Sequence, residues 1–296
     1  MEWSSVTLTS LGGIANWVDE SVTTMLTGVV TPMVASMSEK LMPFVAVCLS
    51  IALIWYGWLI MTGAIQTPVL AAARRVLNIG IIVGIAGAGG LYQQQIAGVM
   101  LDLPTSVAKL FTDSQKTPSE MMDEAANKGA EIGTRIQDRA PTGVGNLARA
   151  FGFFIIALLI SIISAFMSAV GMIVLITVKV GMGIVVVLGP LCILALLFEP
   201  TRDFFKAWLS QAMFYAIYAG LFMVVFMFIM GMFGMLQKGL LDLTKADQIN
   251  VFSMLTALIF FSICSKFMLG QVSEVARSVA GGRGGVISVP FLGKLG

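Results

Sequence analysis

The sequence contains no histidine and few charged residues. Lys, Arg, Asp and Glu make up 11% of the 296 residues, whereas residues of the AVILMFWYC group make up 57%. Soluble domains carry about 25% charged residues, so water is not the main solvent of this chain. The absence of histidine excludes His-ligated zinc sites, Ser-His-Asp catalysis and histidine proton relays. Lipid must therefore surround much of the protein.

Cysteine is also scarce, and the net charge is small. Cys48, Cys192 and Cys264 lie far apart in apolar stretches, which favours buried small apolar side chains over metal ligands or redox groups. A net charge of +2 without a sustained basic run gives no basis for tight nucleic-acid binding. We expect no metal, no cofactor and no catalytic residue, and any contact with nucleic acid would be transient.

Long apolar runs take the place of these features. Residues 150–198 are uncharged except for Lys179, and a bilayer core about 30 Å thick requires about 20 apolar residues in a helix. The sequence therefore predicts an all-α polytopic membrane protein of about five transmembrane helices plus one re-entrant or sixth segment. The five candidate spans are residues 41–63, 76–92, 150–178, 207–237 and 248–264.

Orientation decides how residues 180–198 are placed. The positive-inside rule puts Arg74, Arg202 and Lys266 on the cytoplasmic side, which requires an odd number of crossings between residues 150 and 198. The simplest solution is one span followed by a re-entrant or bent segment that its glycines permit. A six-span hairpin with its turn at Lys179 is the alternative. In the five-span arrangement, the N-terminus and the large loop lie outside and the C-terminus lies inside.

Five segments are expected along the chain. They are an N-terminal amphipathic periplasmic segment (1–40), the first two transmembrane helices (41–101), a soluble helical periplasmic loop (102–149), the main transmembrane bundle (150–271) and a flexible basic cytoplasmic tail (272–296).

Within the loop, Thr117-Pro118-Ser119-Glu120 has the pattern of a capping box with proline at the first helical position. A helix should run to about Arg139, although its glycines could break it near residue 129. Apolar and small residues recur on one face of this helix, which favours packing against another helix. That helix could belong to the chain's own membrane domain or to a neighbouring copy in a ring. The seam consists of Met122, Ala125, Gly129, Ile132 and Ile136.

Glycines in the second span suggest a different contact. Gly80 and Gly84 share one helix face, where a second helix could approach closely. The same glycines could instead loosen the helix.

A polar and aromatic stretch follows residue 198. Arg202 and Lys206, with Trp208 close by, form an arrangement that pins a helix end at the level of the lipid headgroups. Gln211 and Tyr215 then form a polar stripe that needs partners within the bundle. Together with neighbouring residues, this stretch resembles the most recognisable region of TrbL-type polytopic inner-membrane proteins of type IV secretion and conjugative transfer systems. The residues that carry the resemblance are Gly189, Pro190, Leu191, Phe198, Thr201, Arg202, Asp203, Trp208, Gln211 and Tyr215.

The resemblance implies a non-enzymatic subunit of the bacterial inner membrane. Such proteins form an oligomeric ring, possibly five-fold, at the base of the secretion channel and pilus stalk. Their partners are minor and major pilins and the inner-membrane and ATPase components of the machine. The resemblance also implies a structural role for Arg202, Trp208, Gln211 and Tyr215, and partner contacts for the loop 102–149.

Two other functions fit less well. A stand-alone transporter or pore would usually show paired repeats and an ionisable residue near mid-membrane, whereas Lys179 and Lys266 can extend toward an interface and no acidic residue lies inside a predicted span. An enzyme would need clustered carboxylates or a nucleotide-binding glycine loop, and the sequence shows neither.

Overall fold

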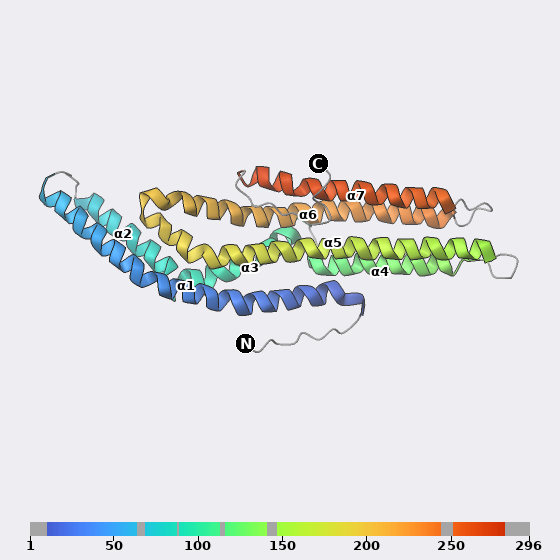
Figure 1. Ribbon diagram of the computed structural model, residues 1–296, viewed down its shortest axis with the longest axis horizontal. Helices are drawn as coiled ribbons and strands as arrows, with labels where there is room; N and C mark the ends of the chain where they lie inside the picture. The colour runs from blue at the N-terminus through green and yellow to red at the C-terminus, as the bar shows by residue number, and fades with distance from the viewer. Residues whose placement is uncertain are drawn as a thin grey trace. The chain divides into compact units, whose positions relative to one another are not determined.

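The computed structural model contains helices and no strands in the residues that it describes, which are 11–63, 69–87, 89–112, 116–140, 147–243 and 251–281. Short helical turns accompany some of the main helices (Figure 1), among them the π-helical turn Tyr92–Ile96. The main helices are α1 (Ile14–Met61), α2 (Val69–Ala86), α3 (Ala97–Thr112), α4 (Pro118–Gln137), α5 (Leu147–Leu194), α6 (Arg202–Leu243) and α7 (Val251–Val279).

Four helices of the described chain are long and apolar enough to cross a membrane. They contain the segments Ile14–Met61, Ala150–Leu197, Glu199–Gly239 and Thr256–Val279, and α2 contributes the shorter apolar helix Val76–Ala86. The prediction of an all-α polytopic membrane protein is therefore confirmed. Each of the five predicted spans overlaps one of these five apolar helices.

The structure corrects three expected boundaries. Residues 180–198 do not form a separate re-entrant or sixth segment, because α5 runs unbroken through Lys179 and Gly189. The N-terminal segment is continuous with the first span, since α1 extends through Pro32 and Pro43. The expected flexible tail is helical up to Val279, and residues 282–296 lie outside the described part of the chain.

The chain divides into two compact units that gather segments from distant parts of the sequence. Unit 1 consists of Met1–Thr24, Pro104–Lys179 and Phe214–Gly296; unit 2 consists of Met25–Leu103 and Val180–Met213. Each unit therefore draws on several of the segments expected from the sequence.

In unit 1, α4 begins where the sequence predicts. The Thr117 side chain accepts a hydrogen bond from the Glu120 amide, and the Glu120 carboxylate accepts one from the Thr117 amide at 2.6 Å. This reciprocal capping satisfies two amides that a helix start would leave unpaired. The helix then continues through Gly129 to Gln137 without the break that the glycines allowed.

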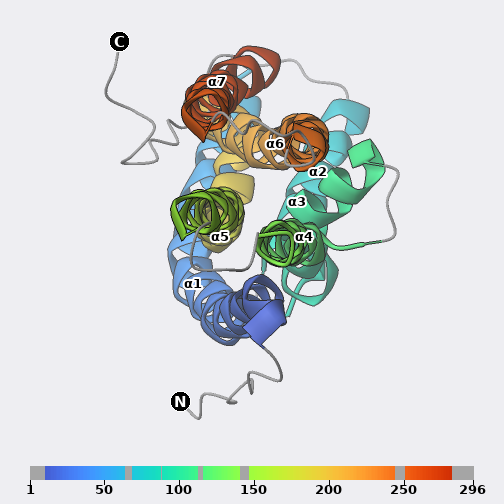
Figure 2. The same cartoon turned by 90° about the vertical axis from the view of Figure 1, so that its right-hand side faces the viewer.

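Small residues let α4 lie directly on α5 of the same chain (Figure 2). A Cβ atom added at Gly129 would collide with the Ser164 side chain, and one at Gly133 would collide with Ser161. Glycine therefore serves close packing here and not at Gly80, where a Cβ would meet no described atom within 4 Å. The structure thus shows the intrachain alternative for the α4 seam: Ile132 is half-buried, and Met122, Ala125, Gly129 and Ile136 are buried.

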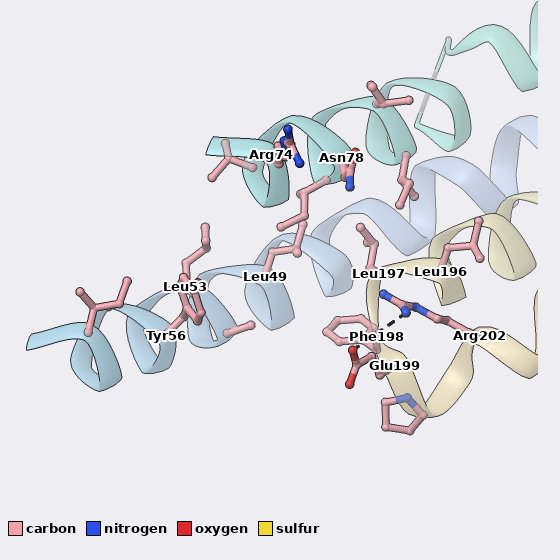
Figure 3. A pocket seen from close by; sticks show the side chains of 18 residues that line it. Leu49, Leu53, Tyr56, Arg74, Asn78, Leu196, Leu197, Phe198, Glu199 and Arg202 are labelled. Atoms are coloured by element: carbon pink, nitrogen blue, oxygen red, sulfur yellow. Dashed lines mark ion pairs between the residues drawn. The ribbon is translucent and has the colours of Figure 1, made fainter. Parts of the chain in front are cut away.

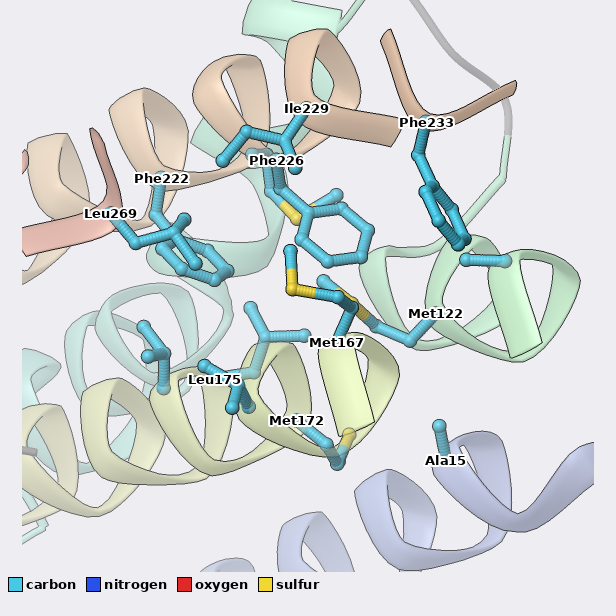
Figure 4. Close-up of a cluster of buried hydrophobic side chains, with 14 of the residues drawn as sticks. Ala15, Met122, Met167, Met172, Leu175, Phe222, Phe226, Ile229, Phe233 and Leu269 are labelled. Atoms are coloured by element: carbon cyan, nitrogen blue, oxygen red, sulfur yellow. The ribbon is translucent and has the colours of Figure 1, made fainter. Parts of the chain in front are cut away.

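Sulfur and aromatic side chains fill the core of unit 1 (Figure 4). The rings of Phe222 and Phe226 lie 6.0 Å apart along α6, and Phe233 stacks on Phe261 of α7 at 5.1 Å. Met122 of α4 enters the same cluster. The flexible methionine side chain fills irregular gaps between such rings, which accounts for the Met- and Phe-rich composition of α6 as a helix interface.

Candidate functional site

The central feature of unit 2 is a proline inside α5. Pro190 has no amide hydrogen, so the carbonyl of Val186, four residues earlier, loses its usual helical donor. The Tyr92 hydroxyl donates a hydrogen bond to that carbonyl at 2.7 Å. Tyr92 is fully buried, where an unpaired carbonyl would cost about 1–3 kcal/mol. The tyrosine thus allows the helix to continue through its proline.

Trp208 of α6 supports the neighbouring carbonyl. Its indole Nε1–H donates to the Val185 carbonyl at 2.7 Å, and its ring lies 6.4 Å from the Tyr92 ring and 5.5 Å from Phe205. The side chain is 8% exposed. Trp208 is therefore a buried packing residue, not the headgroup anchor that its position near Arg202 indicated.

Gly189 makes room for this arrangement. A Cβ atom at residue 189 would overlap with the Tyr92 hydroxyl oxygen and with the ring carbon that carries it. Any larger residue would displace the tyrosine from the carbonyl that it serves. The structure therefore gives the Gly189-Pro190 pair two linked roles: proline frees a carbonyl, and glycine admits its new donor.

The sequence did not identify Tyr92 as a partner of this pair. It lies at the end of a predicted span, in a π-helical turn, and such turns are rare and often occur at functional sites. The proline within an apolar run was the available signal, because it implies that a buried carbonyl needs an external donor.

The turn between α5 and α6 holds three further residues that the sequence singled out. Phe198 is extended, with φ −117° and ψ 129°, and ends the helical path of α5. The Thr201 hydroxyl donates to the Ala195 carbonyl at 2.6 Å. The Arg202 guanidinium lies 3.9 Å from the Glu199 carboxylate, with 54% of its side chain exposed, so this ion pair contributes little to stability.

Gln211 and Tyr215 do not join this cluster. Gln211 is half-buried in unit 2. Tyr215 lies in unit 1, where it packs against the hydrophobic core with its ring 5.4 Å from Phe214. The two residues are therefore assigned to different units, and the polar stripe itself stays a prediction.

Unit 1 contains a second polar site that the sequence did not predict. The Lys179 ammonium lies 2.7 Å from the Asp19 carboxylate, with side-chain exposures of 13% and 14%. It also donates to the Thr23 hydroxyl at 2.9 Å. The sequence predicted that Lys179 extends toward a membrane interface. Instead, its side chain connects α5 to the first turns of α1.

A carboxylate from α4 completes the attachment of α1. The two Asp123 oxygens accept hydrogen bonds from the Ala15 and Asn16 amides at 2.8 and 2.9 Å. These amides belong to the first turn of α1, where negative charge is also favoured by the helix dipole. Ser119 donates to the second Asp19 oxygen at 3.3 Å. The start of α1 is thus fixed to both α4 and α5.

The outer face of α4 carries exposed ion pairs. Glu124 accepts contacts of 2.6 Å from both Lys116 and Lys128. The hydrogen bond from Lys116, followed by that from Lys128, lowers the pKa of the Glu124 carboxyl. These groups border an open groove of about 540 Å³. An exposed cluster of this kind is characteristic of a solvated helix face.

A comparison with protein families supports the pattern recognised in the sequence. The family described as TrbL/VirB6 plasmid conjugal transfer protein matches residues 49–272, about three quarters of the chain. This stretch includes Tyr92, Gly189, Pro190 and Trp208, and it excludes Asp19. A search of curated proteins finds no significant match.

Proposed function

The chain belongs to the TrbL/VirB6 family of plasmid conjugal transfer proteins, and on this premise we propose that it is a non-enzymatic inner-membrane subunit of a type IV secretion machine. In this proposal the subunits form an oligomeric ring at the base of the channel and pilus stalk. The ring supports passage of DNA or protein and assembly of the pilus. Minor and major pilins and the ATPase and inner-membrane components are its partners.

The site around Pro190 carries this proposal. The Tyr92 hydroxyl and the Trp208 indole donate to backbone carbonyls, and both side chains are buried. Their polar atoms hold three helical segments together and are buried away from solvent. A buried network of this type rigidifies a fold, which suits a load-carrying subunit better than a catalyst.

Helix length also supports contacts outside the bilayer. Helices α1 and α5 each contain 48 residues, which corresponds to about 72 Å at 1.5 Å per residue. A hydrocarbon core is about 30 Å thick. An untilted helix of this length would extend beyond the core over more than half of its length. The polar parts that extend beyond the core can contact soluble components of a secretion machine.

Purification of the tagged protein in mild detergent, with mass spectrometry of the bound proteins, tests the proposal. Recovery with pilins, secretion ATPases and other channel components, in a particle containing several copies, is the expected result. Recovery as a monomer or dimer without such proteins would favour a stand-alone transporter or pore.

A transfer assay provides the functional test. Plasmid transfer should fall in a strain whose only copy of the protein carries Trp208→Ala. The substitution removes the hydrogen bond to the Val185 carbonyl and the ring contact with Tyr92. Lys206→Gln is the matched control, since Lys206 lies on the same helix and its side chain is 67% exposed. Normal transfer with normal protein levels in Trp208→Ala would contradict the proposed role.

A further inference from the structure

Unit 2 contains a groove of about 940 Å³ between α1, α2 and the turn that joins α5 to α6 (Figure 3). Its size falls within the range of about 300–1,000 Å³ that is typical of small-molecule sites. The groove combines two kinds of lining. Leu49 and Leu53 of α1, Ile82 of α2 and Leu196 beside the turn form apolar walls.

Two arginines supply the polar lining. Arg74 enters from α2 and Arg202 from the start of α6. Arg74 forms no ion pair with any described residue, and Arg202 has only the 3.9 Å contact with Glu199, whose side chain is 84% exposed. Two positive charges and one carboxylate leave the groove with a net positive charge.

Aromatic residues indicate the depth of the groove in a bilayer. Tyr56 lines it, and the neighbouring Trp55 and Trp58 are 61% and 53% exposed on α1. Exposed tryptophan rings of membrane helices gather at the boundary between hydrocarbon and headgroups. The arginines would then lie where phosphate groups occur, and the leucines would lie beside acyl chains.

We propose that this groove binds an anionic phospholipid. Arg74 and Arg202 hold the headgroup phosphate, because guanidinium groups bind phosphate through paired hydrogen bonds, and the apolar walls contact an acyl chain. Basic pockets between transmembrane helices bind such headgroups in general. Free phosphate has no apolar part that could contact the walls of the groove. A zwitterionic lipid has no net charge and would leave the positive charge of the groove uncompensated. The inference does not depend on the proposed role in secretion.

Lipid selectivity of the full-length protein in phosphatidylcholine vesicles tests this proposal. Trace spin-labelled phosphatidylglycerol or spin-labelled phosphatidylcholine reports the fraction of lipid that the protein immobilises. We expect phosphatidylglycerol to be preferred, and Arg74→Gln and Arg202→Gln each to reduce its association by about fivefold. Lys206→Gln, which removes a charge one turn further along α6 and outside the groove lining, should leave the preference unchanged. Equal loss in all three variants would overturn the proposal in favour of a diffuse surface charge.

A second variant distinguishes lipid binding in the groove from binding by the two arginine charges alone. Leu53→Trp fills the apolar wall and retains both charges, so it should also reduce the immobilised fraction of phosphatidylglycerol. No reduction, with both arginines still required, would overturn the proposal. Displacement of the labelled lipid by millimolar inorganic phosphate at constant ionic strength would identify a free-anion site instead. A change in oligomer mass in Leu53→Trp without a change in lipid selectivity would show that a second copy covers the groove.

Discussion

The hydroxyl of Tyr92 donates a 2.7 Å hydrogen bond to the carbonyl of Val186, which lies 94 residues away in the sequence. This carbonyl is the one that Pro190 deprives of its helical donor. The relationship explains how an apolar helix of 48 residues continues through a proline. It also connects a residue from the end of a predicted span with the most recognisable motif of the chain.

Tyr92→Phe should lower the free energy of unfolding by about 1–3 kcal/mol, because it leaves the Val186 carbonyl buried and unpaired. The same substitution is then made in the Pro190→Ala variant, where the restored amide of residue 190 can donate a hydrogen bond to that carbonyl. The loss should be smaller there by about 1 kcal/mol. Unfolding of the four proteins in mixed detergent micelles measures the coupling, and strictly additive effects would contradict the assignment.

Gly189→Ala should destabilise the protein by about 1–3 kcal/mol, because the new methyl group displaces the Tyr92 side chain. Gly84→Ala is the matched control. No described atom lies within 4 Å of a Cβ at residue 84, and alanine favours the helix by up to about 1 kcal/mol over glycine. Thermal unfolding in detergent should therefore shift in opposite directions, and equal shifts would argue against the close contact at Gly189.

Asp19→Asn should destabilise unit 1 by up to about 3 kcal/mol, since it leaves the nearly buried Lys179 ammonium without its counter-charge. Adding Lys179→Met removes the unpaired charge and should recover much of the loss. Protease sensitivity of the start of α1, followed by mass spectrometry of the fragments, provides the readout. If the increase in protease sensitivity of the double variant equals the sum of the increases in the two single variants, the two charges act independently.

Gly129→Val should separate α4 from α5, because its side chain would occupy the position of Ser164. Gly98→Val introduces the same residue into a helix at a position with no described atom within 4 Å, so it controls for helix propensity. Hydrogen exchange should accelerate along α4 in the first variant and remain unchanged there in the second. Ile132→Asp should have the same effect as Gly129→Val, since Ile132 packs against the core. Unaltered exchange of α4 in Gly129→Val would rule out the contact.

Trp208→Ala and Arg202→Ala should differ, although the sequence assigned both residues a structural role. Loss of the buried indole should lower stability by about 3–5 kcal/mol, whereas loss of the exposed Arg202 should change it by less than about 0.5 kcal/mol. Chemical unfolding of both variants measures the difference. Comparable destabilisation would mean that the α5–α6 turn depends on Arg202 more strongly than its 3.9 Å ion pair indicates.

Local patterns predicted the elements well where local physics determines them. The capping box at Thr117 and the helix that follows it are confirmed, because the hydrogen bonds of a helix start involve residues three apart. The apolar runs identified the membrane helices, because length and hydrophobicity alone decide whether a segment can lie in lipid. The glycine pairs were less informative, since close packing occurs at Gly129 and not at Gly80.

The sequence by itself determined the helical class and the apolar segments, because both depend on composition and on the length of apolar runs. Through a family resemblance it also singled out Gly189, Pro190 and Trp208. Only the tertiary structure decided that α5 is continuous, that Tyr92 satisfies the carbonyl freed by Pro190, and that Lys179 pairs with Asp19. The last two features join residues 94 and 160 positions apart, and a buried polar atom accepts whichever donor the packing brings within reach.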